Sequence, residues 1–546
     1  MSGDRRCWAR PLSFPPCGRL TVFSISPFED VEARGILSLA CFETVASDAL
    51  LPRADLPGAM QSTPLNLNRY VLLFLYMVQT FMTGCVYFGW APLSTMLLRA
   101  GVFSFKCNID EIGALVEGQR GFGSNYICDK QDASVQSLFV ITLATHCTMN
   151  ALAGAMMDTL GPKITSAIGQ CFHIIAWPLI STLTVESNAR VYLGFIFMGL
   201  GAGTAFLPTL LVTRLFPGAA PTVIALIGSA SSASFAIPLV LDLYLTENAI
   251  SGCWWYVGFG PCLFLLIDLL VMPLKAFEVF DADSPKKQED VYMAGSTQLE
   301  CLHFSDRETG VSGSATEAVN PIQPKCQLPR EEPVEVLYKH AFSKIVFSER
   351  YVLIATYFIA VGWATAFYQE AHDRILVPAA KDLLGSALPF SFIPCILLGK
   401  LSETIGILAV MGIVNTADLL AYSFSLKQTV ATGIISVVCF AVYMALFVSQ
   451  VFVYVEENFP AKFFGRLIGI VQLVGGLFSL LCSPLFHLTV SVGSWGMYLV
   501  QLSMIGLLLL MYFVLARMCC IRMAPPTSHT AANPDRQCPD SSIQEP

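Results

Sequence analysis

Charged residues are scarce in this chain of 546 residues, since Asp, Glu, Lys and Arg together make up only 13% of it. Hydrophobic residues make up 54%, and the mean hydropathy is +0.61. Soluble globular domains carry about 25% charged residues, roughly twice as many. The shortage of charge therefore excludes a soluble protein and predicts a polytopic membrane protein.

Motifs for catalysis and metal binding are also missing. The 18 cysteines form no CxxC pair and show no Cys/His spacing typical of zinc. There is no HExxH motif and no grouping of Ser, His and an acid. The glycine-rich run 199–203 lacks the lysine of a P-loop and fits close helix contact instead. We therefore expect no catalytic residue, no metal and no cofactor, and predict that the chain is not an enzyme.

Long apolar runs dominate what is present. A hydrocarbon core of about 30 Å needs about 20 apolar residues per helix, and the chain contains twelve such runs. Helices are the structure that satisfies every backbone polar group over runs of this length. The runs span residues 70–98, 135–157, 164–185, 191–213, 221–245, 253–273, 350–369, 386–402, 407–425, 429–454, 465–488 and 495–517.

Polar segments divide these runs into two sets of six. We predict an all-α membrane protein with twelve transmembrane helices in two pseudo-symmetric six-helix bundles. Met60 opens the stretch that leads into the first helix, so residues 1–59 belong either to a tail or to an over-extended start. The predicted parts are a disordered N-terminal tail at 1–68, an N-terminal bundle at 69–275, a cytoplasmic linker at 276–348, a C-terminal bundle at 349–518 and a C-terminal tail at 519–546.

Two loops repeat one pattern of Gly, three residues, an acid, two residues and Gly. The first copy occupies residues 154–161, and the second begins 245 residues later, at 399–406. Each of two Phe-Pro pairs also follows a run, and their prolines, Pro217 and Pro460, lie 243 residues apart. A shared offset indicates two homologous halves, the architecture of many secondary transporters.

A Gly-Trp pair recurs in the first and seventh runs, as Gly89-Trp90 and Gly362-Trp363. In mid-membrane such residues either break the helix and expose backbone polar groups to a cavity, or they serve close packing with an aromatic filler. Both interpretations stay open from the sequence.

Basic residues set the expected orientation. The short loops do not decide it, because Arg374 and Lys381, after the seventh run, are among the charges that would lie outside. The residues that flank the helices favour both termini inside the cell. These residues are Arg69, Lys275, Lys344, Arg350, Arg517 and Arg522. The repeated loops would then face the cytoplasm.

The same orientation places the long loop after the first run outside the cell. That loop contains Cys107 and Cys128. An oxidising compartment permits a disulfide between them, and two free thiols are the alternative.

The first repeated loop resembles the cytoplasmic signature of the major facilitator superfamily, Gly-x-x-x-Asp-basic-x-Gly-basic-basic. Gly154, Asp158, Gly161 and Lys163 match it, whereas non-basic residues fill two of its basic positions. In that superfamily the acid stabilises the outward-open state. The resemblance implies that the loop is a gating latch between the two halves; the alternative is a tight turn that merely needs glycines.

Carried over to this chain, the resemblance places Asp158 beside Arg466 at the start of the eleventh helix, with Arg214 as a second candidate partner. The acid of the second loop would face the start of the fifth helix. The gating candidates of that loop are Gly399, Glu403 and Gly406.

Segments 83–93, 101–107 and 127–132 narrow the resemblance. With the stretch from Thr145-His146 to Asp158, they resemble the apicomplexan amino acid transporter family and, more distantly, the animal large neutral amino acid transporters. The resemblance implies uptake of amino acids across the parasite plasma membrane by alternating access. We expect a monomer in the lipid bilayer, with an amino acid as its small-molecule partner and no nucleic-acid partner.

Acidic residues within the runs give the only direct hint about the substrate. Asp242, Asp268 and Asp418 fall inside predicted helices, and no Lys or Arg lies equally deep. This bias favours a cationic amino acid such as arginine or lysine, with large neutral or aromatic amino acids as the alternative. Asp242 is the best candidate, because the fifth helix borders the cavity. Glu370 lies at a helix end, where a solvated or gating role is expected.

We expect the first, fourth, seventh and tenth helices to line the cavity. For each aromatic candidate, packing or a place in the interfacial belt is the alternative. The candidates for substrate binding, besides Asp242, are Tyr87, Trp90, Thr204, Trp363, Tyr368 and Tyr443.

Two other classes compete with an amino acid transporter. A sugar or monocarboxylate carrier is one, although an anion carrier should show Arg or Lys in its cavity helices. A non-transporting nutrient sensor with a transporter fold is the other. Nothing resembles a dedicated sodium cage, so facilitated or potential-driven movement is the simpler expectation, and proton coupling stays open.

Overall fold

A computed structural model describes residues 60–108, 127–183, 188–244, 249–278, 342–460 and 463–523. All of them belong to one compact unit, residues 53–546. Most of the predicted tails and linker, at 1–59, 279–341 and 524–546, lies outside the described residues, as do residues 109–126 of the long loop after the first run.

The described chain is helical, with eleven helices long and apolar enough to cross a membrane. Large apolar side chains such as Leu266 and Phe513 are exposed on their outer faces, as lipid contact requires. The eleven spans are 129–159, 162–181, 189–215, 220–244, 253–271, 349–375, 378–405, 407–425, 430–458, 464–492 and 495–522.

The first predicted run is a broken helix and supplies the twelfth membrane segment. It consists of α2 (Arg69–Thr83), the short η3 (Val86–Phe88) and α3 (Trp90–Arg99). A Cβ atom on Gly89 would lie 2.4 Å from the carbonyl oxygen of Phe235, so only glycine permits this approach. Its repeat partner Gly362 lies inside a continuous helix, so a break at the second Gly-Trp pair is wrong.

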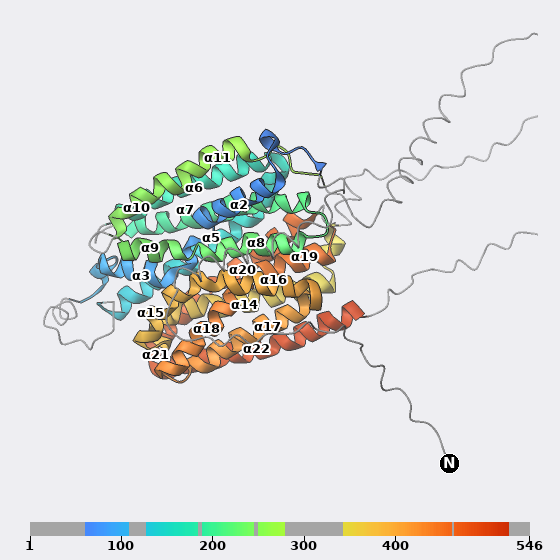
Figure 1. Ribbon diagram of the computed structural model, residues 1–546. Coiled ribbons are helices and arrows are strands. Elements are labelled where there is room, and N and C mark those ends of the chain that lie inside the picture. The colour runs from blue at the N-terminus through green and yellow to red at the C-terminus, as the bar shows by residue number, and fades with distance from the viewer. Residues whose placement is uncertain are drawn as a thin grey trace, which may run out of the picture. The chain divides into compact units, whose positions relative to one another are not determined.

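The first half of the chain forms one helical bundle, drawn from blue to green in Figure 1. Its remaining elements are η2 (Pro64–Asn66), η4 (Ser104–Lys106), α5 (Asp129–Thr159), α6 (Pro162–Ser181), α7 (Asn188–Phe206), η5 (Leu207–Leu215), α8 (Ala220–Ala233), α9 (Ala236–Tyr244), α10 (Ala249–Val257), the π-helical η6 (Gly258–Cys262) and α11 (Leu263–Val271).

The second half forms the other bundle, drawn from yellow to red in Figure 1. Its elements are α14 (Glu349–Ile375), α15 (Pro378–Ala387), η7 (Leu388–Ser391), α16 (Phe392–Ile405), α17 (Ile407–Ser425), α18 (Val430–Leu446), α19 (Ser449–Asn458), α20 (Phe464–Ser479), α21 (Cys482–Val492) and α22 (Ser494–Met523).

The two bundles meet along two symmetric helix pairs, α5 with α20 and α8 with α16. Small residues allow this contact, because a Cβ atom on Gly469 would lie 2.7 Å from the Cα atom of Ala151. A Cβ atom on Gly476 would likewise lie 2.4 Å from that of Cys147. Along these helix pairs the backbones of the two halves therefore pack closely against each other.

Candidate functional site

A small cavity lies between the two bundles, with walls from α5, α7, α8, η3, α18 and α19. Its volume is about 30 Å³. That space admits one or two water molecules and is too small for an amino acid. Its lining residues are Cys85, Phe88, His146, Phe206, Gly228, Ser231, Ser232, Phe235, Met444, Ala445, Phe447, Val448 and Ser449.

None of the seven residues predicted to bind substrate is among the described lining residues. In the first bundle, Tyr87 stacks on the lining residue Phe88, with ring centroids 4.6 Å apart. The indole of Trp90 donates to the Gln136 side chain at 2.6 Å. The hydroxyl of Thr204 is turned to a backbone carbonyl of its own helix.

The three aromatic candidates of the second bundle are held in packing contacts. Trp363 donates its indole N–H to the carbonyl of Phe478. Tyr368 stacks on a neighbouring phenyl ring, with centroids 3.9 Å apart, and its hydroxyl bonds to Ser436 at 2.8 Å. Tyr443 shares a 2.6 Å hydrogen bond with Thr365. Periodicity alone could not separate these residues from the cavity lining.

Asp242, the best sequence candidate for substrate binding, is not among the described lining residues and is paired with a cation. Asp242 lies near the end of α9 and accepts from Arg99, at the end of α3, at 2.8 Å. Arg99 is 52% exposed, so the pair lies at the surface of the bundle. The sequence hid this partner, because the pairing brings together two chain segments more than one hundred residues apart.

The other two acids lie inside single bundles. Asp268 accepts hydrogen bonds from Ser166 and Gln79, at 2.7 and 3.2 Å, within the first bundle. Asp418 is buried in the second bundle, and both of its carboxylate oxygens lack a hydrogen-bond partner in the described chain. Neither residue lines the cavity.

The first repeated loop touches the opposite bundle. Asp158, at the end of α5, accepts from the Arg466 guanidinium of α20 at 3.2 Å. A Cβ atom on Gly154 would lie 3.0 Å from the carbonyl oxygen of Gly465, so the two backbones are in close contact. We call this end of the two bundles the latch end.

The second repeated loop makes the symmetric contact with the first bundle. Glu403 of α16 accepts from the hydroxyl of Thr222, at the start of α8, and from Lys400 at 2.8 Å. A Cβ atom on Gly399 would lie 2.2 Å from that of Ala225. In both cases the end of a helix with the repeated loop contacts the start of a helix in the opposite bundle. The two contacts are thus related by the pseudo-symmetry of the bundles.

The remaining latch candidates lie in or beside the two loops. Arg214 is close to two acids, Glu456 of α19 in the second bundle and Asp158. Gly161 and Gly406 have φ angles of +87° and +85°, and each directly precedes a helix. Such angles favour glycine, because a Cβ atom is strained there. Lys163 donates to the carbonyl of Leu269 at 3.0 Å, and Arg214 to that of Phe277 at 2.7 Å, both within the first bundle.

The opposite end is closed by ion pairs that the sequence did not reveal. Arg374, near the end of α14, contacts Asp132 of α5 at 2.7 Å and Asp129 at 3.0 Å. The Asp132 side chain is completely buried. Arg374 was expected in a solvated loop, but α14 continues past it to Ile375 and carries it into the interface between the bundles.

A second set of contacts extends the same interface. Asp373 is paired with Lys381 at 3.1 Å and accepts from the Gln136 amide at 3.3 Å. Across the halves, the Gln369 amide donates to the carbonyl of the lining residue Phe88 at 3.3 Å. On this side α14 thus contacts the cavity wall through Phe88 without supplying a described lining residue.

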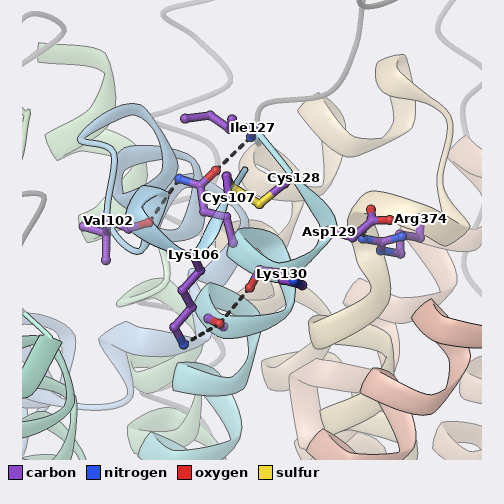
Figure 2. Close-up of a disulfide and its surroundings, with 10 residues drawn as sticks. Val102, Lys106, Cys107, Ile127, Cys128, Asp129, Lys130 and Arg374 are labelled. Atoms are coloured by element: carbon purple, nitrogen blue, oxygen red, sulfur yellow. Dashed lines mark hydrogen bonds and ion pairs between the residues drawn. A yellow bond between two sulfur atoms is a disulfide. The ribbon is translucent and has the colours of Figure 1, made fainter. Parts of the chain in front are cut away.

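A disulfide between Cys107 and Cys128 joins the loop after α3 to the start of α5 (Figure 2). Cys128 immediately precedes Asp129, which Figure 2 shows beside Arg374. Below it, Lys106 donates to Ser134 at 2.8 Å, and burial lowers the pKa of its ammonium group. The disulfide thus fixes the position of the α5 terminus that carries the ion pairs. We call this end the disulfide end.

The structure is closed at both ends around a cavity too small for a solute. The latch end depends on backbone contacts and a half-exposed ion pair, whereas the disulfide end depends on a buried one. Both ends of the cavity therefore have contacts between the same two bundles.

Comparison with known proteins identifies the family. Residues 72–481 match the model of the Major Facilitator Superfamily. Amino acid transporter 6-1 of Toxoplasma gondii (strain ATCC 50611 / Me49) is 41% identical, over 85% of this chain and 81% of the relative. Arginine transporter 1 of the same organism is 35% identical, over 89% of this chain and 94% of the relative.

A solved structure of the peptide transporter POT shares the fold at 12% sequence identity. It covers 82% of this chain and 94% of its own, with a TM-score of 0.51. The predicted all-α fold is thus confirmed, with eleven long helices and one broken one among the described residues. The chain belongs to the Major Facilitator Superfamily and, within it, to the apicomplexan amino acid transporters.

Proposed function

We propose that this protein carries amino acids across the parasite plasma membrane by alternating access. The observation that carries the proposal is a cavity between the two bundles, with contacts between the same bundles at both of its ends. The proposal treats these contacts as two gates. The names of both Toxoplasma relatives, amino acid transporter 6-1 and arginine transporter 1, support the substrate class. The multi-pass topology follows from the fold; the plasma membrane is part of the proposal.

In this mechanism the latch end faces the cytoplasm and the disulfide end faces the outside. A disulfide needs an oxidising compartment, which supports that orientation. Breaking the Arg374 and Asp132 contacts opens the cavity outward, while the latch stays closed. Breaking the Asp158 and Arg466 contact opens it inward. The glycines of the latch allow the backbones to close again without a steric barrier.

Cationic amino acids, arginine first and then lysine, are the proposed substrates. Support comes from the relative named arginine transporter 1. Three buried carboxylates lie at the disulfide end, Asp132, Asp373 and Glu370, of which the first two are paired with Arg374 and Lys381. An oxygen-rich, acidic entry favours a cation over an anion.

Large neutral or aromatic amino acids are the second candidate. The cavity favours them, because four phenyl rings and no carboxylate occur among its described lining residues. The phenylalanines are Phe88, Phe206, Phe235 and Phe447.

Uptake of radiolabelled arginine, lysine, tyrosine and leucine into oocytes that express the chain decides between these candidates. Saturable arginine and lysine uptake above that of water-injected oocytes is the expected result. Uptake of tyrosine or leucine without arginine would select the second candidate. A chain that reaches the surface and moves no amino acid would refute the proposed function and favour a sensor.

A further inference from the structure

Glu370 is a buried carboxylate in the interface between the two bundles. It lies on α14 with no exposed surface. The Ser483 hydroxyl of α21 is the hydrogen-bond donor nearest to it, although outside normal hydrogen-bond geometry, and the carboxylate has no salt bridge in the described part of the chain. Its polar neighbours are Asp132 of α5 and Ser483 of α21. An acid in such a place is costly and calls for a compensating charge or proton.

The cations nearby are already engaged with other acids. Arg374, one helical turn after Glu370, pairs with Asp132, and Lys381 pairs with Asp373. Buried carboxylates at this end thus outnumber the paired Arg and Lys side chains by three to two in the residues described here. Further basic groups at this end are His372, Lys106 and His487. The Nε2 of His372 lies 3.6 Å from Asp373, and Lys106 donates to Ser134.

Glu370 also lies between the gate and the cavity. The preceding residue, Gln369, donates to the carbonyl of Phe88, which lines the cavity. Arg374, four residues later, closes the disulfide end. Along α14, Glu370 therefore lies between Arg374 and the residue that contacts the cavity wall.

We infer that Glu370 binds the side-chain cation of an incoming amino acid, at a subsite between the outer gate and the central cavity. This inference rests on the proposed function and specifies its substrate class. The guanidinium of arginine or the ammonium of lysine would replace the missing counter-charge. The rest of the amino acid would lie toward the phenyl rings and serines of the cavity. Charge-assisted hydrogen bonds of this kind are the strong ones in a site without water.

The alternative to substrate binding is a permanently protonated, structural Glu370. Glutamine has the shape of a protonated glutamic acid but no charge. Glu370→Gln therefore separates the two cases: it leaves a structural residue almost unchanged and removes the charge from a binding residue.

The test compares arginine with citrulline, which has a ureido group of nearly the same shape and no charge. Radiolabelled arginine uptake in oocytes is measured with each compound as competitor, for surface-expressed wild type and Glu370→Gln. For the wild type, the concentration of citrulline that halves the uptake of labelled arginine should be at least tenfold higher than that of unlabelled arginine. Glu370→Gln should raise the KM for arginine at least tenfold and abolish the preference.

Asp418→Asn is the matched control, because Asp418 is an equally buried and unpartnered carboxylate inside the second bundle. It should keep the KM for arginine within twofold of wild type. Glu370→Asp retains the charge and should retain the preference for arginine even if its uptake is slower. The preference is a ratio, so it can be measured on any variant that reaches the surface.

Each outcome has a distinct meaning. If Glu370→Gln transports arginine with an unchanged KM, the inference is overturned and the proposed function stands. If Glu370→Gln lowers the apparent affinities for arginine and for citrulline by the same factor, Glu370 acts on their common α-ammonium group or on folding. The inference is then overturned as well. If the wild type takes up no amino acid, the proposed function and this inference both fail.

Discussion

Replacing Arg374 with glutamine tests whether the buried ion pairs hold the disulfide end closed. The Arg374 guanidinium contacts Asp132 through two nitrogens, at 2.7 and 3.0 Å, and joins the second bundle to the first. Asp132 is fully buried and Arg374 is 18% exposed. Removing one partner of a buried ion pair costs about 3–5 kcal/mol, because the remaining charge stays buried and unpaired.

The lower end of that range applies here, because the Gln136 amide still donates to Asp132 at 3.1 Å. The contact exists only while this end is closed. A loss of about 3 kcal/mol therefore shifts the ratio of closed to outward-open molecules by about two orders of magnitude. The matched variant Arg466→Gln breaks a pair whose partners are 45% and 53% exposed, which is worth at most about 1 kcal/mol.

Cys85 provides the assay, because this native cysteine is buried and lines the cavity. A membrane-impermeant thiol reagent is added outside the cells, and its reaction with Cys85 is followed over time. Arg374→Gln should react at least tenfold faster than wild type, and Arg466→Gln no faster. The part of the labelling that is lost in Cys85→Ser is the reaction at Cys85. Equal rates for Arg374→Gln and wild type would refute the reasoning that this ion pair is the outer gate.

Three further predictions follow from the same contacts. Gly399→Val should reduce uptake at least tenfold without loss of surface expression, because a Cβ atom there would lie 2.2 Å from that of Ala225. Gly412→Val should leave uptake unchanged, because a Cβ atom on Gly412 meets nothing within 4 Å. Cys107→Ser opens a disulfide of sequence separation 21 and should cost about 3 kcal/mol of unfolding free energy, seen as a lower Tm that reductant no longer changes. Asp242→Asn should leave arginine uptake within twofold of wild type, because its partner Arg99 is half exposed. A tenfold loss of uptake would indicate that Asp242 contacts the substrate.

The helices and the duplication could be predicted from the sequence because their signals are local. Apolar runs of membrane length need no tertiary information, and the repeated loops keep their spacing and their glycines. The contact partner of Asp158 could be anticipated for the same reason, since the repeat and the family motif fix which helix end it meets. The gating role of that contact stays a prediction.

The entry side of the site could not be predicted, because it depends on which helices meet. Arg374 follows the predicted seventh run and has the appearance of a loop residue until α14 is seen to continue past it. Glu370 becomes buried only when α5 and α21 cover it. The pairing of Asp242 could not be predicted either, because its partner Arg99 is distant in the sequence and meets it at the surface of the bundle.

The aromatic candidates show a different limit. Tyr368 and Tyr443 lie on helices that border the interface, but their hydroxyls bond within the second bundle. A tyrosine in a membrane helix has the same sequence signal whether it packs in a bundle or lines a cavity. The two cases differ only in which side of the helix faces the other half. That rotation of the helix is set by packing against its neighbours.

The central claim is that this chain carries amino acids through a cavity that opens to one side at a time. The direct measurement is counterflow by the purified protein in proteoliposomes preloaded with unlabelled arginine. External labelled arginine should accumulate transiently inside, and preloading with a non-substrate sugar should abolish the accumulation. A correctly folded protein that gives no counterflow with arginine, lysine, tyrosine or leucine would contradict the account.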